Sequence, residues 1–292
     1  MSIRLVDSCC VNPKYLRSLP PLFARPVLAD FARTGRSGAF SNLAAAAGLD
    51  TQATVGQIYT RVYQCLIEQH RCEYVFKNQI ARRLLLDRHP WREARLLTEF
   101  RIGPAKADVV VLNGTSTVYE IKTRLDNLDR LPQQLAAYKK AFDRIYVVCE
   151  AEQEERIGAA VDPRVGLIAM GVDGELTETR AAAENAPFTD PVTMLAALRR
   201  SEYLEVVATE CGAVPDVPNG RLWGECVQLM QTMDPERVHG HMVRLLRARG
   251  AAASLRQRVN AAPPALTHAL LTLDASDAEL EQLARALEAP PS

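Results

Sequence analysis

Residues 108–122 read D-V-V-V-L-N-G-T-S-T-V-Y-E-I-K, and this stretch decides the fold. Two runs rich in β-branched residues flank Asn113-Gly114, a dipeptide typical of tight hairpin turns. Since successive strand side chains point to opposite faces, Glu120 and Lys122 share one face. Folding at the turn brings Asp108 back beside Glu120, so we expect two carboxylates and one ammonium group on a single patch.

Carboxylates this close raise each other's pKa values unless a cation joins them. Magnesium prefers oxygen ligands and commonly takes one or two carboxylates together with phosphate oxygens. Lys122 beside such an ion can orient or deprotonate a water molecule, or stabilise charge on a phosphate. The stretch contains no cysteine or histidine, which argues against zinc. The pattern predicts a hydrolytic site, whereas the alternative is an ordinary cross-strand ion pair between Glu120 and Lys122.

Helical segments are predicted on both sides of this hairpin. Apolar residues recur at helical spacing over 75–84, so Glu73 lies on a helix that precedes the sheet. A second helix begins just after Pro132. On that helix Gln134 and Tyr138 are four residues apart and therefore share one face.

The resulting order is a helix with an acid, three strands, a helix and a further strand. This order resembles the core of the PD-(D/E)xK nuclease superfamily, and the Q-x-x-x-Y element is similar to that of its RecB-like branch. Between about Glu73 and Cys149 the chain also resembles an uncharacterised bacterial family marked by L-T-E-F, N-G-T-S and Y-E-I-K-T. The residues that carry the resemblance are Glu73, Asp108, Glu120, Lys122, Gln134 and Tyr138.

The resemblance implies an α/β fold with a restriction-endonuclease-like αβββαβ core, in which helices flank a mixed central sheet, with helical additions at both termini. It implies Mg²⁺ or Mn²⁺ as the cofactor. The implied metal ligands are Asp108, Glu120, the Ile121 carbonyl and Glu73. The implied catalytic residues are Asp108, Glu120, Lys122, which positions the attacking water, and Glu73, Gln134 and Tyr138.

Two positions depart from that pattern. Alanine rather than proline precedes Asp108, and proline there would contribute no ligand. Glu99 is a second acid near the sheet that competes with Glu73 to complete the site; we favour Glu73. The alternative for Glu99 is a salt bridge with Arg101 or Lys106.

The preferred function is a metal-dependent nuclease that hydrolyses phosphodiester bonds, a DNA endonuclease in bacterial defence or mobile-element biology. The setting rests on the resemblance alone. An alternative is a non-catalytic protein that keeps the nuclease fold and binds nucleic acid or a partner protein. RNA cleavage is a third possibility, because a site that contacts only phosphate does not distinguish ribose from deoxyribose. Cleavage of both strands of a duplex would need two sites, so a homodimer is plausible.

The net charge of zero hides a local excess of bases. Between Lys77 and Lys106 the chain carries eight Lys and Arg residues against three acids, Asp87, Glu93 and Glu99. A basic surface of this kind is typical of proteins that bind phosphate backbones. The alternative is a solvated helix face and loop. The residues predicted to contact nucleic acid are Lys77, Arg82, Arg83 and Lys106.

Length and composition complete the frame. With 292 residues, of which 48% are hydrophobic, the chain can bury a core. We expect an N-terminal arm and helical hairpin (1–56), a nuclease-like core (57–180) and a helical C-terminal region (181–292). No apolar run reaches eighteen residues and no charged-then-apolar leader is present, so we expect a cytoplasmic protein without membrane contact.

Overall fold

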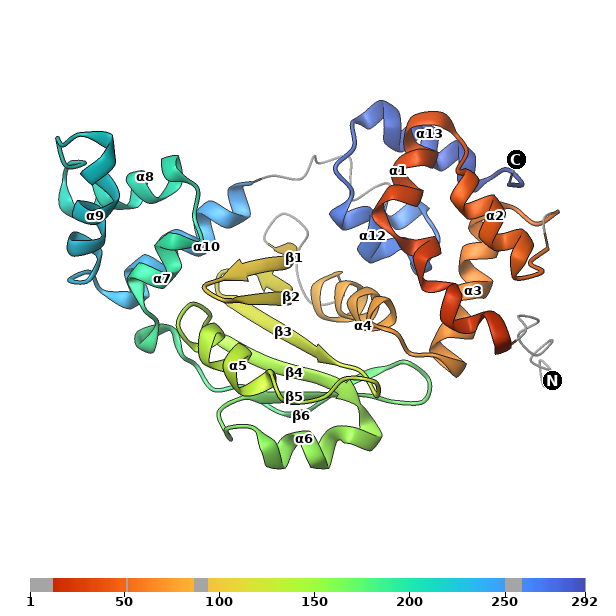
Figure 1. Ribbon diagram of the computed structural model, residues 1–292, viewed down its shortest axis with the longest axis horizontal. Helices are drawn as coiled ribbons and strands as arrows, with labels where there is room; N and C mark the ends of the chain where they lie inside the picture. Colours follow the sequence, from red (N-terminus) through yellow and green to blue (C-terminus); the bar gives the residue numbers. More distant parts are fainter. Residues whose placement is uncertain (1–12, 51, 87–93, 250–258, 292) are drawn as a thin grey trace. The chain divides into compact units, whose positions relative to one another are not determined.

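The computed structural model describes residues 13–50, 52–86, 94–249 and 259–291 (Figure 1). Its internal contacts form two compact units. We call Met1–Asp87, Gly171–Glu175 and Ala251–Ser292 the helical unit, and Arg88–Met170 with Leu176–Gly250 the sheet unit. The domain boundaries expected at residues 56 and 180 stay predictions.

The sheet unit contains a six-stranded sheet whose strands lie side by side in chain order. The strands are β1 (Arg95–Ile102), β2 (Ala105–Leu112), β3 (Ser116–Lys122), β4 (Arg144–Glu150), β5 (Gly166–Met170) and β6 (Leu176–Arg180). Pairing is antiparallel between β1, β2 and β3, parallel from β3 to β5, and antiparallel again at β6. The prediction of an α/β fold with a mixed sheet flanked by helices is therefore confirmed.

The β2–β3 hairpin folds where the sequence indicated. Gly114 has a φ of 102°, a conformation that glycine adopts without steric cost. In the register that follows, Val110 pairs with Val118 and Val109 with Tyr119. Even-numbered residues of both strands therefore face the same side of the sheet.

That side of the sheet is the core of the unit. Helix α5 (Leu131–Lys139) makes the crossover between the parallel strands β3 and β4, which cannot be joined by a tight turn. Its Tyr138 is buried together with Val110 and Val118 in one apolar cluster. Five further helices of the unit contribute buried residues to the same apolar cluster. They are α6 (Glu154–Ala160), α7 (Pro191–Ala196), α8 (Arg200–Cys211), α9 (Asn219–Met230) and α10 (Pro235–Ala248).

The helical unit is built from both ends of the chain. Its N-terminal part contains two short 3₁₀ helices, η1 (Pro13–Ser18) and η2 (Pro20–Phe23), then α1 (Arg25–Thr34), α2 (Gly38–Ala46), α3 (Val55–Gln69) and α4 (Glu73–Gln79), which continues as the π-helical segment η3 (Ile80–Leu86). Its C-terminal part contains η6 (Pro264–Leu266), α12 (Thr267–Thr272) and α13 (Asp277–Leu287). The predicted helical character of both termini is confirmed for these residues.

Buried polar contacts join the two parts of the helical unit. The Tyr74 hydroxyl donates to the Ala265 carbonyl at 2.7 Å. The Asn78 amide donates to the Pro264 carbonyl at 3.0 Å and accepts from the His268 N–H at 2.9 Å. Because a buried amide left without partners is costly, these bonds fix α4 against α12. In the part of the chain that the structure describes, no helix has both the length and the apolar character needed to cross a bilayer.

Candidate functional site

Glu120 is the centre of a buried hydrogen-bond network on the core face of the sheet. It is 1% exposed. Its Oε1 accepts from Lys122 Nζ at 2.8 Å and from Gln134 Nε2 at 2.6 Å. Its Oε2 lies 2.7 Å from the Tyr138 hydroxyl. The structure therefore brings together four of the residues predicted from the sequence: two from the end of β3 and two from one face of α5.

Gln134 holds the charged pair from both ends of its amide. While its Nε2 donates to Glu120, its Oε1 accepts from Lys122 Nζ at 3.0 Å. Lys122 is itself buried, at 7% exposure. An ammonium group has three donors, and these contacts use two of them. The third can serve a water molecule or a phosphate oxygen.

Tyr138 is the fourth member of the network. Its hydroxyl lies 3.0 Å from the Lys106 carbonyl as well as 2.7 Å from Glu120. Burial raises the pKa of Tyr138 far above its usual value, and the nearby Glu120 and Asp108 carboxylates raise this pKa further. Tyr138 therefore stays protonated and acts as a hydrogen-bond donor.

Asp108 lies on β2 and contacts the neighbouring strand. Its Oδ2 accepts from the Ile121 N–H at 2.8 Å, and the residue is half-buried. The N–H and C=O of one strand residue face the same neighbouring strand. The Ile121 carbonyl therefore faces the β2 side, where Asp108 lies, as the predicted ligand set requires.

Glu99 of β1 lies opposite Asp108. Thr98 pairs with Val109 and Phe100 with Ala107, so the register places Glu99 across from Asp108. The two side chains have carboxylate oxygens within 4.8 Å of each other. Lys106 forms an ion pair with Glu99, as the alternative for this acid anticipated.

Glu99 also has an unusual backbone. Its φ is 54°, a value that residues other than glycine seldom adopt. Strain of this kind persists only where the surrounding structure imposes it, and it often accompanies function. From the sequence, Glu99 was an alternative to Glu73, and its position opposite Asp108 was not predicted. The signal for it is the turn at Gly103, where Ile102 pairs with Ala105, because the β1–β2 register can be counted from that turn.

Glu73, the other predicted acid, begins α4 in the helical unit. Within that unit its Oε1 lies 2.6 Å from Lys77 Nζ. Lys77, which the sequence predicted to contact nucleic acid, forms this ion pair in the structure. The role of Glu73 in the metal shell stays a prediction.

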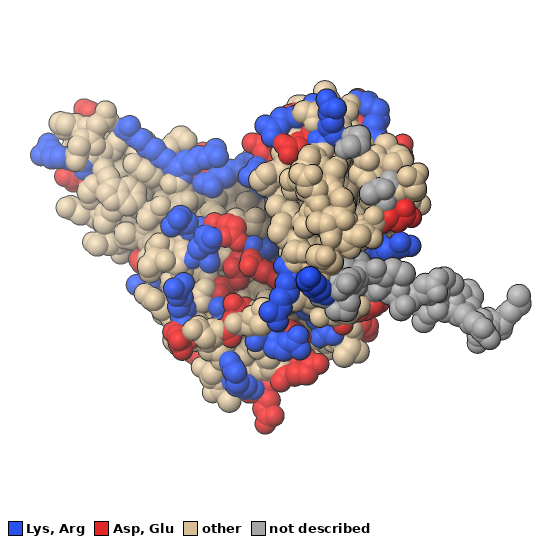
Figure 2. All heavy atoms as spheres, turned by 45° about the vertical axis from the view of Figure 1, so that its right-hand side comes forward, with Lys and Arg blue, Asp and Glu red and all other residues tan. Residues whose placement is uncertain are grey.

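The predicted basic surface is mixed with acids. Arg83 forms an ion pair with Glu175, and Lys106 pairs with Glu99. Figure 2 shows both basic and acidic side chains on the face it presents, with a group of acidic side chains near its middle. Arg88 and Arg92, which belong to the same run of bases, lie outside the described residues, as do the acids Asp87 and Glu93.

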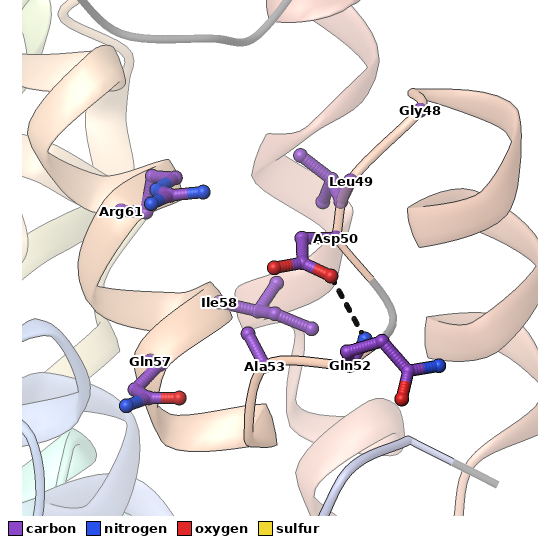
Figure 3. Close-up of a pocket in the computed structure, with 8 residues that line it drawn as sticks. All are labelled: Gly48, Leu49, Asp50, Gln52, Ala53, Gln57, Ile58 and Arg61. Carbon is purple, nitrogen blue, oxygen red and sulfur yellow. Dashed lines mark hydrogen bonds between the residues drawn. The ribbon is translucent and has the colours of Figure 1, made fainter. Parts of the chain in front are cut away.

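A pocket of about 520 Å³ opens in the helical unit, where α2 leads into α3 (Figure 3). Its rim carries two opposite charges, Asp50 and Arg61, and Asp50 Oδ1 accepts from the Gln52 N–H at 2.9 Å. The residues that line it are Gly48, Leu49, Asp50, Gln52, Ala53, Gln57, Ile58 and Arg61. None of the predicted site residues lies there.

A second buried polar network occupies the opposite end of β3. The Ser116 hydroxyl lies 2.7 Å from His239 Nε2 of α10 and accepts from the Asp143 N–H at 3.0 Å. The Asp143 carboxylate accepts from the Thr115 hydroxyl at 2.7 Å. Burial lowers the pKa of His239, and the nearby Asp143 carboxylate partly offsets this. Ser116 is fully buried, so this network fixes α10 to the sheet and is closed to substrate.

Comparison with known proteins places the chain in a family. The family model described as bacteriophage P4 protein cII matches residues 67–263, which is more than half of the chain. A relative, protein cII of Enterobacteria phage P4, is 32% identical over 63 residues, or 22% of this chain and 24% of the relative. This alignment therefore spans about a quarter of the relative's length. No solved structure matches the chain. The chain belongs to the bacteriophage P4 protein cII family.

Proposed function

We propose that the sheet unit is a metal-dependent hydrolase of phosphodiester bonds in nucleic acid, with DNA as the preferred substrate. The observation that carries the proposal is the buried network of Lys122, Glu120, Gln134 and Tyr138. Removing a carboxylate and an ammonium group from water costs free energy that their attraction seldom repays in full. Such a pair fits a chemical role better than a purely structural one. The order β1, β2, β3, α5, β4 in the sheet unit, preceded along the chain by α4 of the helical unit, supports a restriction-endonuclease-like core.

The oxygen atoms around Asp108 suit Mg²⁺ or Mn²⁺. Asp108 and Glu99 offer carboxylate oxygens within 4.8 Å of each other, and the Ile121 carbonyl faces the same strand. Hard divalent cations take carboxylate and carbonyl oxygens. Within the sheet unit, the residues that would hold the ion are Asp108, Glu120, Ile121 and Glu99. When bound, the ion would polarise a phosphate oxygen and stabilise the charge that develops on it.

The remaining groups would act on water and on the phosphate. The third donor of Lys122 would orient the attacking water or contact a phosphate oxygen. Gln134 keeps the Lys122 ammonium group in place through its 3.0 Å contact. Tyr138 holds the second oxygen of Glu120 and so fixes the direction of that carboxylate. A carboxylate offers about four lone-pair positions, and the three hydrogen bonds to Glu120 leave one position for the metal shell.

A protein that binds nucleic acid or a partner without cleaving is the second candidate. The observation that favours it is the burial of Glu120, whose oxygens already accept three hydrogen bonds. A network satisfied in this way could serve as a polar core. Metal binding separates the two candidates, because a structural network has no need of a divalent ion.

The biological setting proposed here is bacterial defence or mobile-element biology. Its support is that a relative comes from a bacteriophage. Whether the substrate is DNA or RNA depends on contacts to the sugar, and a homodimer would place two sites on a duplex. The choice of DNA and the homodimer are therefore further parts of the proposal.

The test is cleavage of supercoiled plasmid, single-stranded DNA and RNA with Mg²⁺ or Mn²⁺. Wild type is compared with Asp108→Ala and Lys122→Ala, and Lys140→Ala, an exposed lysine just after α5, is the matched control. Loss of cleavage in the two site variants and in chelator, with the control active, would support the nuclease. Titration of Mn²⁺ into wild type and Asp108→Ala reports metal binding independently of cleavage.

A further inference from the structure

The turn that follows Lys122 exposes a large apolar side chain. Leu125 is 74% exposed, whereas the β3 residues just before the turn are buried. Three Cα–Cα steps separate Leu125 from Lys122, so their Cα atoms lie at most about 11 Å apart. An exposed leucine on its own needs no explanation. Leu125, however, lies close to the proposed site and next to basic residues, and these two features together suggest that it contacts a ligand.

The turn holds Leu125 outward. Asp126 accepts from both the Thr123 N–H, at 2.8 Å, and the Thr123 hydroxyl, at 2.7 Å. The Thr123 hydroxyl in turn accepts from the Leu125 N–H at 3.3 Å. Gln153 donates to the Thr123 carbonyl at 3.4 Å. Because the turn is tied at its base, ordering Leu125 against a ligand costs little further backbone entropy.

Cations accompany the leucine. Arg124 precedes it, and Arg130 ends the same loop; both are exposed. Neither forms an ion pair within the described ranges, whereas Lys77, Arg83 and Lys106 all pair with glutamates. The loop also contains two acids: Asp126 is engaged by Thr123, and Asp129 accepts from the Asn127 side-chain amide at 3.0 Å. Arg124 and Arg130 are therefore better placed to meet a phosphate backbone than Lys77, Arg83 and Lys106, three of the four bases singled out from the sequence.

We infer that this turn, Thr123–Arg130, contacts single-stranded nucleic acid: Leu125 packs on the face of an unpaired base, and Arg124 and Arg130 contact the flanking phosphates. In a duplex, base faces are stacked and only their edges are open to the grooves. Apolar side chains reach base faces where bases are unstacked, and bases of single strands are open to such contact. The inference deepens the proposed function and names its preferred substrate class.

The test measures binding separately from cleavage. A single-stranded 2-aminopurine oligonucleotide and the same sequence as a duplex are titrated with protein in Ca²⁺, a cation that takes the same kinds of ligand as Mg²⁺. Wild type is compared with Leu125→Ser, with the conservative variant Leu125→Met and with Arg124→Ala, which should weaken binding of the single strand by removing a phosphate contact. The matched control is Val172→Ser, because Val172 is also 74% exposed and lies on a different turn.

We expect wild type to bind the single strand more tightly than the duplex and to change its 2-aminopurine fluorescence. Leu125→Ser should weaken single-strand binding about tenfold and abolish the fluorescence change, while Val172→Ser and Leu125→Met stay close to wild type. Equal binding by wild type and Leu125→Ser, a preference for duplex, or no binding by wild type would overturn the inference. A cleavage rate that is unchanged in Lys122→Ala would instead overturn the proposed function. Failure of the binding inference and failure of the proposed function are therefore distinguishable.

Discussion

Glu99 lies directly across the β1–β2 pair from Asp108, and its φ of 54° makes it the one residue other than glycine with a positive φ in the described ranges. The carboxylate oxygens of the two residues approach within 4.8 Å. Both like-charge repulsion and backbone strain are therefore concentrated at one point of the sheet. A bound divalent ion would relieve the first of these.

Replacement of Glu99 by glycine should stabilise the fold and weaken metal binding. Glycine adopts a positive φ freely, so we expect the free energy of unfolding to rise by about 1 kcal/mol. Mn²⁺ affinity should fall, because one carboxylate is lost. Urea denaturation and Mn²⁺ titration measure the two effects. Thr177→Gly, at an exposed position of β6 without a positive φ, is the control and should destabilise. If Glu99→Gly destabilises like the control, strain at Glu99 is refuted.

Replacement of Tyr138 by phenylalanine should destabilise the sheet unit. It removes the hydroxyl that lies 2.7 Å from Glu120 and leaves a buried carboxylate oxygen without this donor. Bonds to charged groups of this kind contribute about 1.5–3 kcal/mol. Urea denaturation measures the loss, with Tyr203→Phe of α8 as a matched control because the structure gives its hydroxyl no contact to the site. A loss equal to that of the control would show that Glu120 does not depend on Tyr138.

Alkaline pH should weaken the helical unit through its buried tyrosines. Burial raises the pKa of Tyr63 to about 12, whereas an unfolded tyrosine titrates near 10. Above pH 10 the unfolded chain releases this proton before the folded one does, so stability falls as pH rises from 10 to 12. Tyr63→Phe should reduce that fall by on the order of 2 kcal/mol. Urea midpoints at pH 9 and pH 11.5 for both proteins give the comparison; parallel declines would contradict it.

Mild acid should act through His239. Burial keeps the pKa of His239 below its usual value of 6.5, so the unfolded chain takes up a proton first as pH falls. Stability is then fully present above pH 6.5 and declines below it. His239→Gln, which keeps a polar partner for Ser116, should flatten this decline. Thermal unfolding from pH 7.5 to pH 5.5 shows the difference, with His241→Gln as control. A decline that survives in His239→Gln would assign the pH dependence to other groups.

Local features of the sheet unit could be predicted because short-range rules govern them. Asn113-Gly114 fixes the hairpin, and strand alternation places Glu120 and Lys122 on one face, where the structure has them. Helical spacing places Gln134 and Tyr138 together, and both contact Glu120. These relationships span few residues and depend on backbone geometry alone.

Other features depend on contacts that no local rule reaches. Ser116 and His239 are 123 positions apart and meet only because α10 packs on the sheet. The strain at Glu99 reflects its tertiary surroundings, since glutamate carries no intrinsic preference for a positive φ. Leu125 is exposed because Thr123 and Asp126 close the turn in which it lies. Its hydrophobicity alone would have placed this side chain in the core.

The central claim is that Lys122 and Asp108 belong to a metal-dependent phosphodiester hydrolase. Its most direct test is the rate of supercoiled plasmid and single-stranded DNA cleavage in Mn²⁺ by wild type, Lys122→Ala and the control Lys140→Ala. We expect cleavage by wild type and control, none in chelator, and a loss of about a hundredfold or more in Lys122→Ala, as follows removal of a group that stabilises developing charge. Cleavage by Lys122→Ala at the wild-type rate, or no cleavage by wild type together with no Mn²⁺ binding, would contradict the claim.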